Sequence, residues 1–157
     1  MQQTSLASGR ASLLGRSTAY ARPLCSALLA VQGIYYFGTG IWPLISIETF
    51  QMVTGPKTDH MVTGREADHW LVMTVGVLIV AIAIPLLIAA LRGRTSAEIV
   101  VLALGSALGL TAIDVIYVAR QVIPPIYLVD AVAEIALIGA WFYAWVHEPA
   151  GTQAVAH

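Results

Sequence analysis

The chain has 157 residues, of which 58% are hydrophobic and only 11% are charged, with eight basic and nine acidic residues and a net charge of −1. Soluble domains average about 25% charged residues, so this chain has too few charges to cover a soluble surface, and its mean hydropathy of +0.78 indicates lipid as its solvent. The small net charge excludes an electrostatic footprint for nucleic acid, and the single Cys25 excludes a disulfide framework or a cysteine-based metal site.

Residues 1–23 are expected to form a flexible basic segment, because they hold three arginines and no acid. Such a segment is either an organelle transit peptide or the basic start of a signal anchor. We favour the anchor, because the apolar run that follows is longer than the roughly 7–15 residues of a cleaved secretory signal.

Four apolar stretches follow, each close to the roughly 20 residues that cross about 30 Å of hydrocarbon as a helix. Unpaired strand edges are not stable in lipid, so helices are the default. The sequence therefore predicts an all-α, four-helix transmembrane bundle over residues 24–147. Its spans are expected at about 24–47, 70–91, 99–118 and 126–146. Short connections predict that the last three helices form a compact antiparallel unit, which the first helix closes.

The basic residues also predict an orientation. The N-terminal arginines share one side with Arg92 and Arg94, whereas Lys57, Arg65 and Arg120 fall on the other side. The positive-inside rule then places both the N- and the C-terminus in the cytoplasm. Residues 148–157 are expected to be a disordered tail.

The outer loop, residues 48–69, contains a tandem repeat of nine residues. MVTGPKTDH, read from Met52, is followed at once by MVTGREADH, and the two copies agree at six positions. Each copy is interpreted as a turn at its Thr-Gly step. The repeat also gathers weak metal-ligand candidates, because histidine and carboxylate can bind zinc, although a solvated loop explains the same residues. These candidates are Asp59, His60, Asp68 and His69.

Three acidic residues, Asp114, Asp130 and Glu134, fall inside the predicted spans, where a charge costs several kcal/mol. Asp130 and Glu134 are four residues apart and share one helix face. The short turn between the last two helices brings Asp114 into the same half of the bundle. Clustered carboxylates repel one another, so at least one is expected to carry a proton at neutral pH.

Neutral polar and aromatic side chains at similar depth complete the predicted site. We expect a polar pocket that is closed on the cytoplasmic side and opens outward under the repeat loop. The candidate residues for binding a ligand or a proton are Asp114, Asp130, Glu134, Tyr35, Tyr36, Gln32, Thr39, Tyr117 and Trp141. Thr74 and Thr111 could join them, and Arg120 is the nearest counter-charge in the sequence.

Three interpretations of the buried acids stay open at this point. They could be hydrogen-bonding links between helices, a site for a ligand, an ion or a proton, or catalytic groups. The middle of each span lacks His, Lys and Cys, so nucleophile–base chemistry has no residues to use. No catalytic residue and no cofactor are therefore expected. Gly105 and Gly109 form a G-x-x-x-G pattern that could accept another helix or another subunit.

Several segments between about residues 30 and 140 carry a family resemblance: YYFGTGIWPL, ETFQMVTGPKTD, WLVMTVG, AIDVIYVAR and YLVDAVAE. Together they resemble a family of small bacterial four-span membrane proteins with no assigned activity. The resemblance implies the fold and a multi-pass protein of the cell inner membrane, and it supplies no catalytic residue. In that pattern one VTGPKTD segment leads directly into WLV, so the second copy is a departure that weakens any role for Asp68 and His69.

A more distant likeness, in architecture alone, is to the four-helix membrane bundles of the sterol-isomerase and sigma-2-receptor type. The leading hypothesis is an integral membrane protein whose carboxylate and aromatic pocket binds a lipid-like ligand, a cation or a proton. The alternative is a structural or accessory subunit, which would dock through the glycine face as a homo-oligomer or in a larger membrane complex. A membrane-embedded isomerase-like enzyme is the third hypothesis.

Overall fold

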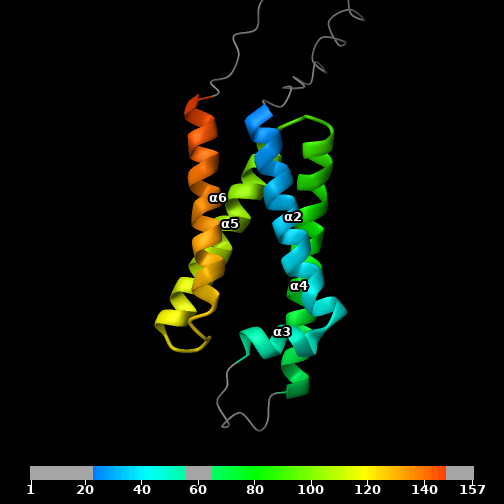
Figure 1. The fold of residues 1–157 in the computed structure, drawn as a ribbon, viewed down its shortest axis with the longest axis vertical. Helices are drawn as coiled ribbons and strands as arrows, with labels where there is room; N and C mark the ends of the chain where they lie inside the picture. Colours follow the sequence, from blue (N-terminus) through cyan, green and yellow to red (C-terminus); the bar gives the residue numbers. More distant parts are fainter. Residues whose placement is uncertain (1–22, 56–64, 148–157) are drawn as a thin grey trace, which may run out of the picture.

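The computed structural model describes residues 23–55 and 65–147, with only the backbone described at 65–68. These residues form helices α2 (Pro23–Ile45), α3 (Ile47–Thr54), α4 (Arg65–Leu91), α5 (Ala97–Ala119) and α6 (Tyr127–His147), with no strand among them (Figure 1). All but α3 are long and apolar enough to cross a membrane. The predicted all-α fold is thus confirmed for the described residues, and its four predicted spans coincide with four candidate membrane-spanning helices.

Helix α3 lies where the sequence predicts a loop. Ser46 interrupts the helical run after α2 and becomes the N-cap of α3, because its Oγ accepts a hydrogen bond from the Thr49 backbone N–H at 3.5 Å. The helix is held against the end of α2 by Trp42, whose Nε1 donates to Thr49 Oγ1 at 3.0 Å and whose ring packs edge-on against Phe50.

Part of the tandem repeat is helical as well. Helix α4 begins at Arg65, so Arg65–His69 at the end of the second copy form its first turns rather than a loop. The sequence predicts a turn in the second copy at Thr-Gly-Arg-Glu. The Arg and Glu of this segment are helical instead. The first copy after residue 55 lies outside the described residues, as do the predicted N-terminal segment 1–22 and the tail 148–157.

The four long helices form two antiparallel pairs. Helix α2 packs along α4, and α5 packs along α6, whereas α4 and α5 contact each other only slightly although a short turn joins them. The two pairs converge at the end that carries the α4–α5 turn, here called the turn end, and diverge toward the end that carries α3, here called the α3 end (Figure 1). The expected compact unit of the last three helices is therefore corrected, because α4 leaves α5 to pack against α2.

Glycine explains the close packing of α2 against α4. A Cβ atom built on Gly40 would lie 2.8 Å from the Gly76 carbonyl oxygen, and one on Gly76 would lie 2.8 Å from the Gly40 carbonyl oxygen. Small residues allow this approach of two backbones, which favours helix association in lipid. The pair singled out in the sequence, Gly105 and Gly109, has open space instead, because a Cβ atom added at either position would meet no atom within 4 Å.

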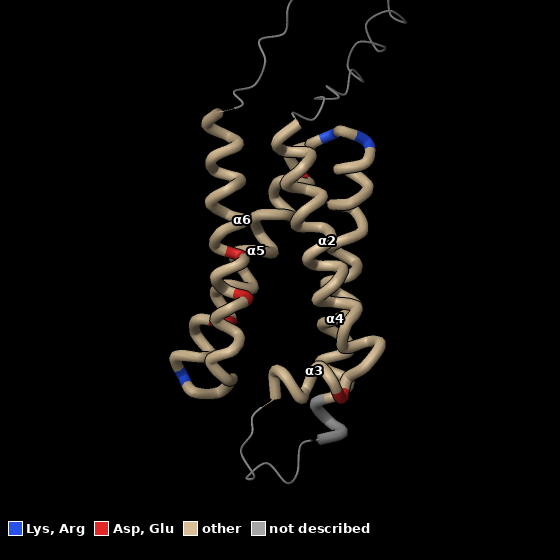
Figure 2. The backbone as a smooth tube through the Cα atoms, viewed as in Figure 1, with Lys and Arg blue, Asp and Glu red and all other residues tan. Residues whose placement is uncertain are grey.

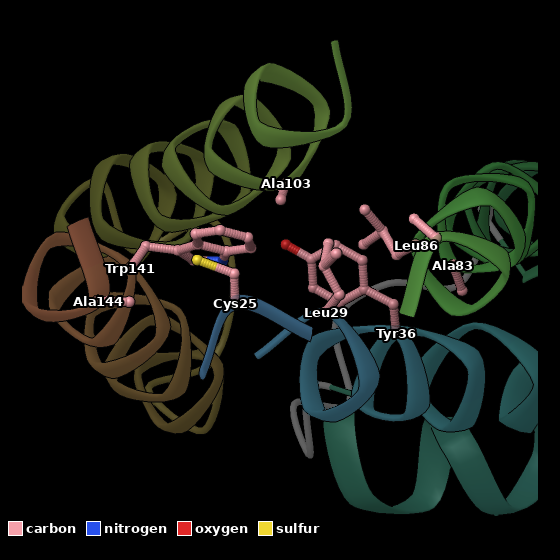
Figure 3. Packing of buried hydrophobic residues seen from close by; sticks show 9 residues of the cluster. Cys25, Leu29, Tyr36, Ala83, Leu86, Ala103, Trp141 and Ala144 are labelled. Atoms are coloured by element: carbon pink, nitrogen blue, oxygen red, sulfur yellow. The ribbon is translucent and has the colours of Figure 1, made fainter. Parts of the chain in front are cut away.

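A small apolar core lies where the pairs converge. Tyr36 of α2 and Trp141 of α6 point toward each other across the space between the pairs, with Ala103 of α5 close by (Figure 3). Most other members are alanine or leucine, so the helices meet over short side chains. The buried cluster consists of Cys25, Leu29, Tyr36, Ala83, Leu86, Ala89, Ala103, Trp141 and Ala144.

The glycine contact predicts a sharp difference between two positions of α2. Gly40→Ala places a methyl group against the Gly76 carbonyl and should lower the free energy of unfolding by about 1–3 kcal/mol, as overpacking does. Gly38→Ala is the matched control, because a Cβ there meets no atom within 4 Å and alanine favours the helix. Unfolding in detergent would be followed by circular dichroism, and equal stability of the two variants would contradict a close-packed glycine seam.

Candidate intramembrane polar site

One polar stripe on α2 carries the site. The buried residues of α2 recur every three or four positions, as the helical period requires, and they include Gln32 and Tyr36. Glu134 and Trp141 lie on the corresponding buried stripe of α6. Gln32 and Glu134 have no exposed surface, and Tyr36 is 1% exposed. The site therefore lies inside the bundle, where α2 meets the α5–α6 pair.

A directed chain of hydrogen bonds joins these residues. Trp141 Nε1 donates to Gln32 Oε1 at 2.9 Å, which fixes the orientation of the amide. Gln32 Nε2 donates to the Ala103 carbonyl at 2.8 Å and to Tyr36 Oη at 3.1 Å. Tyr36 Oη then donates to Glu134 Oε2 at 3.0 Å. The chain from the indole to the phenol thus ends on the carboxyl group of Glu134.

The second carboxyl oxygen of Glu134 is in a different position. Glu134 Oε1 is buried and has no hydrogen-bond partner among the described residues. A buried polar atom without a partner costs about 1–3 kcal/mol, and more if the group is charged. A proton on the carboxyl group removes its charge and so lowers this cost.

The other two intramembrane acids lie close to Glu134 and to each other. Asp130 is an electrostatic neighbour of Asp114, whose Oδ2 is buried with no hydrogen-bond partner among the described residues. Tyr35 Oη donates to Asp130 Oδ1. Both aspartates also act electrostatically on Glu134. Apart from Glu98 in the first turn of α5, the acidic positions of α5 and α6 gather along the stretch where these two helices run side by side (Figure 2).

The described surroundings of this carboxyl cluster (Asp114, Asp130 and Glu134) supply no positive charge. The side chains that interact electrostatically or by hydrogen bonds with Asp114 and Glu134 carry carboxyl or hydroxyl groups, and none of them is Lys or Arg. Arg120, the nearest counter-charge in the sequence, is the C-cap residue of α5, and it is exposed. Three carboxylates without a counter-charge repel one another strongly where the dielectric constant is low.

Several candidates from the sequence lie away from the cluster. Thr39 Oγ1 donates to the carbonyls of its own helix, at Tyr35 and Tyr36. Thr74 likewise bonds to the Trp70 carbonyl and is exposed, and Tyr117 is 37% exposed. Thr111 has a buried hydroxyl with no partner in the described part of the chain.

Sequence reasoning missed one member of the network. Ser106 Oγ lies 3.2 Å from Tyr36 Oη and 2.7 Å from the Leu102 carbonyl, and its single proton can be donated to one of these two oxygens at a time. Ser106 adjoins the buried stripe of α5, which runs through Ala103, Ala107 and Asp114. Its position beside a stripe of buried alanines that leads to Asp114 could have indicated a role in the network. In the sequence of α5 alone, however, Ser106 looks like an ordinary small residue.

The metal candidates of the repeat are not brought into a described site. Asp59 and His60 lie outside the described residues, and the side chain of Asp68 is not described. His69 is partly buried in the first turns of α4. Within residues 23–55 and 65–147, no group of three His, Cys, Asp or Glu side chains could hold a metal ion.

A groove of about 730 Å³ lies at the turn end, whereas the sequence predicts a pocket that opens at the other end. Residues from the first half of α5 and the last turns of α6 form its walls, and Cys25 of α2 contributes to them. Trp141 belongs both to the groove wall and to the hydrogen-bond chain. The lining residues are Cys25, Thr95, Ser96, Ala97, Val100, Val101, Leu104, Leu108, Ile138, Trp141, Phe142 and Trp145.

Comparison with known proteins adds no further assignment. The chain matches no family model, no curated protein and no solved structure. The fold class and the four candidate spans therefore define it as a protein with the features of a multi-pass membrane protein. The family resemblance of its segments stays a prediction.

The indole bond to Gln32 predicts a measurable coupling. Trp141→Phe leaves Gln32 Oε1 buried without a donor, so it should lower the free energy of unfolding by about 1–3 kcal/mol. In the Gln32→Leu background the same change should cost clearly less, because the stranded oxygen is absent. Trp145→Phe is the control, since Trp145 is 71% exposed. Additive effects in this double-mutant cycle would show that the bond has no energetic role.

Proposed function

We propose that this chain is a multi-pass membrane protein that binds and releases a proton at Asp114, Asp130 and Glu134, within the membrane. The observation that carries the proposal is the environment of Glu134. Its carboxyl group is fully buried, one oxygen accepts from Tyr36, the other has no described partner, and two more carboxyl groups are its electrostatic neighbours. Protonation removes the charge of Glu134, which relieves the repulsion and lowers the cost of burying the unpartnered oxygen.

A proton fits this site better than a metal ion does. A divalent cation needs several ligands at fixed distances, and no described group of side chains offers them. A proton needs neither a coordination shell nor a cavity. Asp114 has a like-charged neighbour in Asp130, and like charges at close range favour a proton on one member of such a group.

The arrangement also supports a route for the proton. Asp130 is only partly buried, whereas Glu134 and Gln32 are fully buried. From Asp130 to Trp141 the polar groups follow α6 over eleven positions, or roughly 16 Å, which is about half of a hydrocarbon core of ~30 Å. We infer that protons enter through Asp130 from the α3 end and stop at the Gln32 amide.

The proposed topology follows the basic residues. Arg92 and Arg94 lie in the α4–α5 turn, at the end where α2 begins and α6 ends (Figure 2). The positive-inside rule favours the cytoplasm for that end, so the α3 end and Asp130 would face outward. The inner membrane of a bacterial cell is the compartment that the sequence resemblance implies.

Infrared spectroscopy of the full chain in liposomes tests the proposal. The protein at neutral pH should show the C=O band of a protonated carboxylic acid, shifted in D₂O. Asp114→Asn, Asp130→Asn and Glu134→Gln should each remove or shift part of this band, because each deletes one member of the coupled cluster. Glu48→Gln is the control, since Glu48 is an exposed acid on α3.

The pH dependence separates a working site from a purely structural one. If the cluster exchanges protons with water, the band should fade reversibly as the pH is raised and return when it is lowered. A band that is missing at neutral pH, or one that persists unchanged into strong alkali, would overturn the proposal. The second outcome would assign the carboxyl groups to helix–helix hydrogen bonding alone.

A further inference from the structure

The groove at the turn end is an independent feature that the proton site does not use. Its walls are mainly aliphatic and aromatic, with Val101, Leu104 and Leu108 from α5 and Ile138, Phe142 and Trp145 from α6. Several of these are widely exposed, including Val101 at 70% and Phe142 at 64%. In a membrane this surface is covered by hydrocarbon, and its volume of about 730 Å³ lies in the range of small-molecule sites, about 300–1,000 Å³.

The length of the groove matches a lipid chain. Its α5 wall extends from Thr95, just before the helix, to Leu108, thirteen positions along the chain and roughly 20 Å at the helical rise. One leaflet of a bilayer core of ~30 Å measures about 15 Å. The groove is therefore long enough to hold an acyl chain of one leaflet, which would lie along most of it.

Polar and basic groups stand at the end of the groove where a headgroup would be. The hydroxyl-bearing Thr95 and Ser96 line it there, and Thr95 Oγ1 is buried with no partner among the described residues. Ser96 is the N-cap of α5 but makes no side-chain capping bond. Arg92 and Arg94 precede them in the same turn and are exposed. Glu98, in the first turn of α5, is the one acid in this part of the sequence.

This distribution of charge selects one class of occupant. Two arginines against one glutamate leave the turn positive, and arginine forms strong charge-assisted bonds with phosphate. Basic pockets between transmembrane helices are typical sites for anionic headgroups. We propose that the groove binds an anionic phospholipid, with one acyl chain between α5 and α6 and the phosphate at the α4–α5 turn.

Native mass spectrometry of the full chain in detergent tests this site, with phosphatidylglycerol and phosphatidylcholine of identical acyl chains as probes. One phosphatidylglycerol should be retained per chain, at least tenfold more tightly than phosphatidylcholine. Val101→Trp fills the groove and should weaken binding at least tenfold. Val132→Trp is the matched control, because Val132 is 66% exposed on α6 and does not line the groove.

A second pair of variants tests the headgroup end. Arg94→Gln should reduce the preference for phosphatidylglycerol, whereas Arg120→Gln, at the opposite end of α5, should leave it unchanged. Equal retention of both lipids, or equal binding by the Val101 and Val132 variants, would overturn the proposal. Oleate that binds as tightly as phosphatidylglycerol would overturn it too, because the occupant would then be a fatty acid rather than a phospholipid.

Discussion

Burial of the Glu134 carboxyl group is the constraint on which the rest of the structure depends. A carboxyl group in a low-dielectric interior is tolerated only when donors reach it or a proton neutralises it. Tyr36 supplies the donor, Gln32 supports Tyr36, and Trp141 holds Gln32 in place. These three contributions come from α2 and α6, which belong to different helix pairs. The polar chain is therefore also the connection that holds the two pairs in register, because the apolar core around it consists mainly of short side chains.

The two helix pairs are held together by different physics. Between α2 and α4 the backbones meet at Gly40 and Gly76, so the attraction comes from close van der Waals packing over a long seam. Between α2 and α6 the contact is shorter and depends on directional hydrogen bonds among Gln32, Tyr36, Glu134 and Trp141. Packing of the first kind does not respond to protonation, whereas the second kind does. Any response to protonation should therefore change how the pairs sit against each other before it changes the pairs themselves.

The sequence predicted the spans well, because the length and apolarity of a helix in lipid are properties of a single segment. The expected ranges 24–47 and 126–146 differ from Pro23–Ile45 and Tyr127–His147 by at most two residues at each end. Helix α3 was missed because eight mixed residues carry no spanning signal. The helical period alone groups Gln32 with Tyr36, and Asp130 with Glu134. It cannot show which faces meet, so Ser106 was missed and Thr39 and Tyr117 were included, since such facts depend on how two helices are rotated against each other.

Trp141 belongs to two features of the molecule, the groove and the hydrogen-bond chain that leads to Glu134. Its side chain forms part of the groove wall, while its indole N–H is committed to Gln32. A molecule in the groove that rotates the ring must strain that bond, and a change in the amide must in turn reshape the wall. By thermodynamic linkage the influence is mutual, so whatever the groove prefers to hold and whatever charge state the acids prefer are parts of one equilibrium. If the groove and the acids act as proposed, Trp141 is the side chain through which a lipid in the groove would influence the buried acids.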